Sequence, residues 1–259
     1  LLDPATIVSG LGVGLLVGMT GVGGGSLMTP ILVLLFGVHP VTAVGTDLLF
    51  AAATKSVGVV VHGFNRTVDW GVTGLLALGS VPATAATLVV LSQIETKTGA
   101  AGGLVSHVLG IALIVTSLAL FFRHRLKALV EMRRGQDGTV RGRRIATVAL
   151  GAALGVAVSI SSVGAGAIGV TALLMLYPRL PIARLVGSDI AHAVPLTLIA
   201  GLGHWVIGSV DFGLLMPLLV GSIPGVVIGS ALGPKLPEAG LRFVLAAVLT
   251  VVGFKLVAS

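Results

Sequence analysis

A run of glycines interrupts apolar sequence near the start of the chain. It reads Gly21-Val22-Gly23-Gly24-Gly25-Ser26-Leu27-Met28-Thr29-Pro30, and it returns in altered form as Ser162-Val163-Gly164-Ala165-Gly166-Ala167-Ile168-Gly169. Glycine costs a helix interior about 1 kcal/mol relative to alanine, so each cluster predicts a broken helix. Inside a bilayer such breaks are tolerated only where protein or a water-filled cavity satisfies the freed backbone groups. Two of them in matching halves indicate a transport site.

The composition identifies a membrane as the solvent. Of the 259 residues, 55% are hydrophobic and 10% are charged, and the mean hydropathy is +1.11. A water-soluble domain of this size is not so apolar, so we predict a polytopic membrane protein. The absence of cysteine excludes disulfides, thiolate metal ligands and a cysteine nucleophile. We find no cluster of potential ligands that suggests a metal, and we expect no cofactor.

The basic residues are concentrated in one hydrophilic stretch, residues 123–144. The formal net charge of +7 would suggest nucleic acid as a partner for a soluble protein. Here the clustering instead indicates a cytoplasmic loop, with no nucleic-acid partner. The stretch separates a first transmembrane repeat, residues 1–122, from a second, residues 145–259. It holds half of the sixteen lysines and arginines: Arg123, Arg125, Lys127, Arg133, Arg134, Arg141, Arg143 and Arg144.

Ten apolar segments divide the chain. They cover residues 5–20, 26–37, 41–63, 70–91, 100–122, 145–161, 167–177, 182–207, 212–232 and 239–258. A hydrocarbon core of about 30 Å needs about 20 helical residues, which 26–37 and 167–177 do not supply. Because each short segment follows a glycine break, we predict that 5–37 and 145–177 form broken or re-entrant helical hairpins.

An internal repeat relates the two halves. Four motifs recur at one offset of 142 positions (204 − 62), which shared composition does not explain. The glycine breaks lie one residue off this register. The matched motifs are Val44-Gly45-Thr46-Asp47 with Val186-Gly187-Ser188-Asp189, His62 with His204, Val68-Asp69 with Val210-Asp211, and Gly79-Ser80-Val81-Pro82 with Gly221-Ser222-Ile223-Pro224.

The orientation of the halves follows from counting crossings. If each broken segment returns to the side it entered from, each half has three full crossings, and the second half is inverted. With 123–144 inside, inversion leaves only Lys97 and Lys255 outside. If both broken segments crossed fully, five basic residues would lie outside, namely Lys97, Arg179, Arg184, Lys235 and Arg242, which fits the positive-inside rule less well. We therefore predict an all-α membrane protein of two inverted repeats, each a broken or re-entrant helical hairpin plus three transmembrane helices.

The glycine breaks also predict a binding site. A helix that begins just after a glycine turn offers unpaired N–H groups and the positive end of its dipole to an anion. The alternative is that these glycines serve close helix packing. The candidate substrate-binding residues at the two breaks are Gly23, Gly24, Gly25, Ser26, Thr29, Ser161, Ser162, Gly164 and Gly166.

Three charged residues inside apolar segments add to this site. Lys55 lies near mid-membrane, where an ionised group costs at least ~2.5 kcal/mol. It can supply positive charge to an anion, or form a structural salt bridge with Asp47 or Asp189. His192 follows Asp189 by three positions on the same helical face, so the pair can carry protons. Alternatively, Asp47 and Asp189 each tether a neighbouring broken helix.

The two matched histidines lie near the ends of their helices. His62 and His204 are followed, across a short connection, by Asp69 and Asp211. We expect a histidine–aspartate hydrogen bond to hold each of these turns.

These motifs together resemble the TauE/SafE family of sulfite and organosulfonate exporters. The resemblance rests on residues 21–30, the Gly45-Thr46-Asp47 helix, the His62–Trp70 connection and their second copies, and it covers about residues 8–255. It implies a secondary transporter that moves small sulfur-containing anions across the inner membrane. The second break has Ala165 and Ala167 where the first has Gly24 and Ser26, so the two half-sites are not equivalent.

Several functions remain open at this stage. The favoured one is an anion exporter working by alternating access, with or without proton coupling. A passive anion channel and a membrane-embedded enzyme using Asp189 and His192 are the alternatives, and the enzyme is the weaker because no nucleophile stands at a diagnostic spacing. The expected partners are a small anionic substrate and the lipid bilayer. The sequence does not indicate the oligomeric state, and a homodimer is one of the possibilities.

Overall fold

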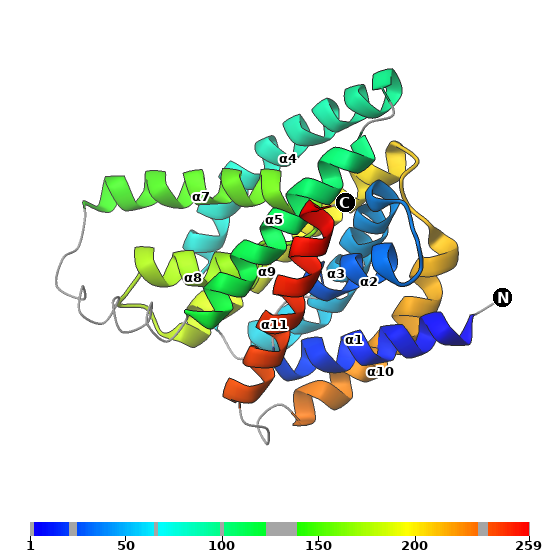
Figure 1. Cartoon of the computed structure of the whole chain (residues 1–259). Helices are drawn as coiled ribbons and strands as arrows, with labels where there is room; N and C mark the ends of the chain where they lie inside the picture. Colours follow the sequence, from blue (N-terminus) through cyan, green and yellow to red (C-terminus); the bar gives the residue numbers. More distant parts are fainter. Residues whose placement is uncertain are drawn as a thin grey trace.

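The computed structural model describes residues 3–20, 25–64, 67–98, 101–122, 139–232 and 238–258. Within these ranges the chain is helical and contains no strand (Figure 1). The ten predicted apolar segments are all present as helices, with ends within seven residues of the expected ones. They are α1 (Pro4–Thr20), α2 (Gly25–Leu34), α3 (Pro40–Phe64), α4 (Trp70–Thr98), α5 (Ala101–Phe121), α7 (Val140–Ser161), α8 (Ala167–Leu176), α9 (Ile182–Val206), α10 (Phe212–Leu232) and α11 (Glu238–Val257).

Length and hydropathy make this a multi-pass membrane protein. In the described residues five helical stretches are long and apolar enough to span a bilayer: Trp70–Ile94, Gly102–Phe121, Val140–Ser161, Ile182–Val206 and Phe212–Gly229. By contrast, α2 and α8 have 10 residues each. At 1.5 Å per residue they reach about 15 Å, roughly half of a hydrocarbon core.

The second glycine run breaks the helix, as the sequence predicts. α7 ends at Ser161, and Ser162 takes the left-handed conformation with φ 59°. Gly164 and Gly166 follow with φ of 132° and 117°, a region that favours glycine. α8 then begins at Ala167. In the first half α1 ends at Thr20 and α2 begins at Gly25, while residues 21–24 lie outside the described part.

α7 and α8 form a hairpin. The Tyr177 hydroxyl at the end of α8 and Thr147 Oγ1 in the second turn of α7 are hydrogen-bonded at 2.8 Å. The Arg143 guanidinium carbon lies 5.4 Å from the centroid of the Tyr177 ring. The end of α8 therefore lies beside the N-terminal half of α7.

The basic stretch is shorter at its end than the sequence predicts. α7 begins at Val140, with the Thr139 side chain accepting a hydrogen bond from the Gly142 N–H. Arg141, Arg143 and Arg144 therefore belong to the first turns of a helix rather than to a loop ending at residue 144. The cause is the Thr139 cap, which sets the helix start one turn earlier. Residues 123–138 lie outside the described part.

Each half contributes helices that pack on the other half. α1 packs most extensively on α10, α4 on α7, α5 on α11 and α3 on α9, and Figure 1 shows α1 beside α10. Glycines allow these close approaches. A β-carbon on Gly79 of α4 would lie 1.9 Å from the Val148 carbonyl oxygen, and one on Gly221 of α10 would lie 2.0 Å from the Ile7 carbonyl oxygen.

Hydrogen bonds between the halves are reciprocal as well. The Asp69 N–H donates to Ser188 Oγ at 2.8 Å, and the Asp211 N–H donates to Thr46 Oγ1 at 3.0 Å. Asp69 matches Asp211 in the repeat, and Thr46 matches Ser188. The two repeated segments therefore exchange equivalent contacts.

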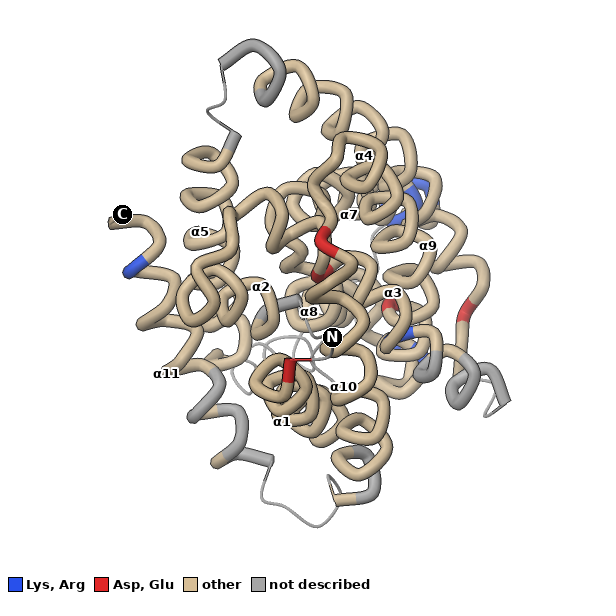
Figure 2. Tube along the Cα trace, turned by 90° about the vertical axis from the view of Figure 1, so that its right-hand side faces the viewer, with Lys and Arg blue, Asp and Glu red and all other residues tan. Residues whose placement is uncertain are grey.

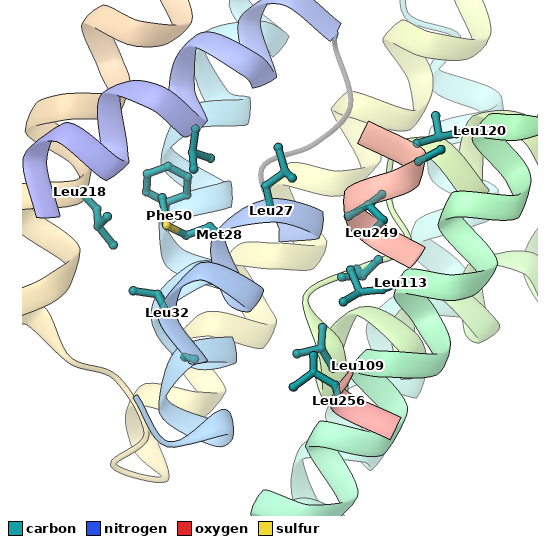
Figure 3. Close-up of a cluster of buried hydrophobic side chains, with 14 of the residues drawn as sticks. Leu27, Met28, Leu32, Phe50, Leu109, Leu113, Leu120, Leu218, Leu249 and Leu256 are labelled. Carbon is teal, nitrogen blue, oxygen red and sulfur yellow. The ribbon is translucent and has the colours of Figure 1, made fainter. Parts of the chain in front are cut away.

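The largest apolar core surrounds α2. Figure 3 shows Met28 and Leu32 of α2 facing Phe50 of α3 and Leu218 of α10, all with 0% exposure. A second part of the same cluster joins leucines of α5 and α11. Lipid is as apolar as these side chains, so packing rather than transfer from water supplies the stabilisation. The packing holds α2, and with it Thr29, at a fixed place beside α3.

Candidate functional site

Two buried aspartates lie at the half-helices. Asp47 on α3 is 0% exposed and Asp189 on α9 is 1% exposed. Figure 2 shows acidic residues inside the bundle near α2, α3 and α8. A carboxylate is costly to bury unless it is paired or hydrogen-bonded, so its surroundings indicate its role.

Asp47 is hydrogen-bonded to the first half-helix and lies near the second break. The Thr29 hydroxyl of α2 donates a hydrogen bond to Asp47 Oδ2. The Ser162 hydroxyl, from the second break, lies close enough to interact with the same carboxylate. Oδ1 of Asp47 and Oγ of Ser162 have no hydrogen-bond partner with good geometry in the described residues. Asp47 thus touches the first half-helix and faces the turn before the second.

Asp189 faces the beginning of α8. A β-carbon on Gly169 would lie 2.0 Å from Asp189 Oδ1, so only the missing side chain lets the carboxylate approach. The Gly166 N–H points toward the same carboxylate, although neither oxygen of Asp189 has a hydrogen-bond partner among the described residues. The carboxylate therefore occupies the positive end of the α8 dipole, where the sequence predicts a substrate anion.

Lys55 links the two carboxylates electrostatically. It lies on α3, partly buried, and its ammonium group interacts at a distance with both Asp189 and Asp47. His192 experiences the same positive charge. Since the oxygens of Asp189 lack hydrogen-bond partners, Lys55 forms no direct contact with that carboxylate in the described structure.

His192 is hydrogen-bonded to Ser80, which is not among the candidate site residues predicted from the sequence. Its Nε2 and Ser80 Oγ of α4 are hydrogen-bonded at 2.8 Å, and its Nδ1 has no partner among the described residues. His192 and Asp189, which the sequence places on one helical face, form no hydrogen bond with each other in the described residues. Ser80 belongs to the repeated Gly79–Pro82 motif. A serine near a proline inside an apolar segment was the sequence signal that could have indicated a hydrogen-bonding partner here.

The positions of the first repeat and the second that match Ser80 and His192 do not form the same hydrogen bond. Ser222 corresponds to Ser80, and its hydroxyl has no partner in the described residues. Phe50 corresponds to His192 and offers no hydrogen-bonding group. The polar site is therefore asymmetric, with the imidazole in one half only.

The second matched histidine also has an unexpected partner. His204 Nε2 is hydrogen-bonded to the Ser159 carbonyl oxygen at 2.9 Å. Asp211 Oδ1 instead accepts from the Leu214 N–H at 3.1 Å and caps α10. The predicted His204–Asp211 bond is wrong, because a helix-start aspartate caps its own helix at lower entropic cost. The His62 side chain lies outside the described part.

The remaining predicted site residues lie in the turn before α8 or at the beginning of α2. Ser161 Oγ donates to the Ala157 carbonyl oxygen at 2.7 Å and accepts from the Val163 N–H at 3.2 Å, so it stabilises the turn. Gly164 and Gly166 form the turn itself. Gly25 and Ser26 begin α2, with side-chain surroundings outside the described part. Gly23 and Gly24 also lie outside it.

Charged and polar side chains with unsatisfied atoms lie around the half-helices. This cluster contains two carboxylates, an ammonium group, an imidazole and several hydroxyls, and a buried polar atom left without a partner costs about 1–3 kcal/mol. Such atoms gather here: Asp47 Oδ1, Ser162 Oγ, both oxygens of Asp189 and His192 Nδ1. In the described residues no group of three or more His, Cys, Asp or Glu is placed to hold a metal ion.

A multi-pass helical bundle with an interrupted helix at a buried polar cluster is the architecture of a membrane transporter. The chain belongs to the family described as sulfite exporter TauE/SafE, whose model matches residues 6–256. The family resemblance drawn from the sequence is thereby confirmed.

Relatives carry the same general description. The chain is 36% identical over 251 residues to "Probable membrane transporter protein YjnA" of Bacillus subtilis (strain 168), covering 97% of this chain and 98% of the relative. It is 27% identical over 233 residues to "Probable membrane transporter protein YdhB" of the same organism, covering 88% and 89%. A "Probable membrane transporter protein" of Xylella fastidiosa (strain 9a5c) is 27% identical over 241 residues, covering 89% and 84%. No solved structure matches significantly.

Proposed function

We propose that this protein is a secondary transporter that exports small sulfur-containing anions, such as sulfite or organosulfonates, across the inner (plasma) membrane. The family description supports the substrate class. The proposed binding residues are those at the two breaks, residues 23–26, Thr29, Ser161, Ser162, Gly164 and Gly166, together with Lys55.

The observation that carries this proposal is the position of Lys55 relative to Asp47 and Asp189. Its charge acts on both carboxylates, and these lie at the two half-helices. An arriving anion competes with Asp189 for the positive end of α8 and is attracted by Lys55. Binding therefore requires the Asp189 carboxylate to turn toward Lys55 or to take up a proton.

This competition supplies a mechanism for proton coupling. If Asp189 is protonated, α8 is free to hold the substrate anion. If Asp189 is ionised, it excludes a second anion from the same place. Asp47, held by Thr29, acts as the fixed member of the pair, and His192 is the neighbouring group able to exchange a proton.

Alternating access by inverted repeats, residues 1–122 and 145–259, fits the contacts between the halves. The reciprocal Asp69–Ser188 and Asp211–Thr46 bonds support a twofold relation. The contact of Tyr177 with Thr147 supports a re-entrant α7–α8 hairpin. With such a hairpin Arg179 stays on the side of Arg143, in agreement with the positive-inside rule.

The test is substrate flux into proteoliposomes containing the wild type, Lys55→Ala, Lys55→Arg or Lys255→Ala. Lys255 is an exposed lysine in the last turn of α11 and serves as the control. We expect Lys55→Ala to lose at least tenfold in sulfonate flux, Lys55→Arg to keep part of it, and Lys255→Ala to match the wild type. Undiminished flux in a folded Lys55→Ala protein would remove Lys55 from the site.

A second measurement addresses coupling. A sulfonate keeps its charge near neutral pH, so its flux can be followed while a pH gradient is imposed. A coupled carrier changes its flux with the gradient, whereas a passive anion channel does not.

Competition among sulfite, sulfate, sulfoacetate, taurine and thiosulfate then identifies the substrate. Conversion of labelled sulfonate to a new compound without net movement would favour an enzyme.

A further inference from the structure

A second polar site lies away from the buried cluster. A cavity of about 620 Å³ opens between the beginnings of α4 and α7 and the α8–α9 connection. Three guanidinium groups line it, from Arg143, Arg144 and Arg179. Figure 2 shows basic residues gathered beside α4, α7 and α9.

The cavity carries an excess of positive charge. Its lining carboxylate, Asp69, directs Oδ1 toward its own helix, where it accepts from the N–H groups of Gly71 and Val72 at 3.1 Å each. Among the described lining residues, three arginines and one aspartate leave two net positive charges. Guanidinium groups bind phosphate oxygens through paired hydrogen bonds, so the cavity fits a phosphate-bearing ligand.

Apolar side chains also line the cavity. Among the described lining residues these are Val72, Leu75, Val140 and Leu180, with Gly71 and Tyr177 beside them. Val140 and Ile145 on α7 are 60% and 61% exposed, so this end of the helix presents a hydrophobic surface in a chain that spans a membrane. A ligand that fits both parts has an anionic head and an apolar tail.

We propose that this cavity binds the phosphate headgroup of an anionic phospholipid from the arginine-rich leaflet. Basic pockets between transmembrane helices on the cytoplasmic side bind such headgroups. The site is separate from the proposed transport site, and lipid bound there braces the end of the α7–α8 hairpin against α4.

The test uses the full chain purified in detergent and titrated with phosphatidylglycerol, with bound lipid counted by native mass spectrometry. The test variant is Arg144→Gln/Arg179→Gln. The matched control is Arg141→Gln/Arg184→Gln, which removes the same charge from exposed residues of α7 and α9 that do not line the cavity. At about fivefold per arginine, we expect roughly 25-fold weaker binding in the test variant and less than a twofold change in the control.

Two competition experiments distinguish a lipid phosphate from a soluble phosphate. Phosphatidylcholine and inorganic phosphate, each added at tenfold excess, are expected not to displace phosphatidylglycerol. Displacement by inorganic phosphate would overturn the lipid assignment in favour of a soluble anion. Equal binding by the test and control variants would overturn the site. If the glutamine variant does not fold, Arg144→Lys/Arg179→Lys replaces it, and wild-type binding by that variant also contradicts paired guanidinium–phosphate contacts.

Discussion

Asp189 Oδ1 lies so close to Gly169 that a β-carbon on that glycine would come within 2.0 Å of it. The contact joins α9 to the first turn of α8, at the positive end of that helix dipole. A buried carboxylate in this place both fixes the half-helix and competes with any anion that approaches it.

Replacement of Gly169 tests this contact. We expect Gly169→Ala to destabilise the protein by about 1–3 kcal/mol, because the methyl group displaces the carboxylate or the helix. Gly74→Ala is the control, since a β-carbon on Gly74 meets nothing within 4 Å. Thermal unfolding in detergent measures both. Adding Asp189→Ser to Gly169→Ala should recover part of the loss, and strictly additive losses would contradict the contact.

The Thr29–Asp47 hydrogen bond is expected to stabilise the first half-helix. Thr29→Val removes the donor and leaves a buried carboxylate with neither oxygen bonded among the described residues, at a cost of about 1–3 kcal/mol. Thr29→Ser keeps the hydroxyl and should lose less. Unfolding temperatures of the two variants in the same detergent provide the comparison, and an equal loss would show that the methyl group contributes as much as the hydrogen bond.

The Ser80–His192 bond predicts coupling between α4 and α9. Ser80→Ala and His192→Phe each leave a buried polar group without its partner, whereas the double variant removes both groups. We expect the double variant to lose less stability than the sum of the single variants, by about 0.5–1.5 kcal/mol. Phe50 occupies the matched position in the first half, so phenylalanine is a suitable replacement. A coupling energy of zero would show that the two side chains do not interact.

The reciprocal bonds between the halves should contribute equally. Ser188→Ala and Thr46→Val each deprive one aspartate N–H of its acceptor, and each is expected to cost about 1 kcal/mol. Thr171→Val is the control, because the Thr171 hydroxyl donates only to the Ala167 carbonyl oxygen of its own helix. Unequal losses in the first two variants would argue against equivalent roles in the two halves.

The helices and their breaks are predictable because they depend on local sequence. Hydropathy locates each apolar segment, and Gly164 and Gly166 adopt backbone angles that few other residues tolerate. The constant offset further predicts which positions of the halves correspond.

The partners of the polar side chains are not predictable in the same way. Ser80 meets His192 and Ser159 meets His204 across helices that are distant in sequence. Nearness along the chain suggested Asp189 for His192, within one helix, and Asp211 for His204, across a short connection, and neither bond forms in the described residues. Side-chain partners depend on the rotation of each helix about its axis, which apolar periodicity does not specify when nearly every face is hydrophobic.

The exchange of helices between the halves has a consequence during synthesis. When the first 122 residues have left the ribosome, α1 and α4 still lack α10 and α7, the helices on which they pack most extensively. The early helices therefore remain loosely associated in lipid until the second half of the polypeptide has been inserted beside them.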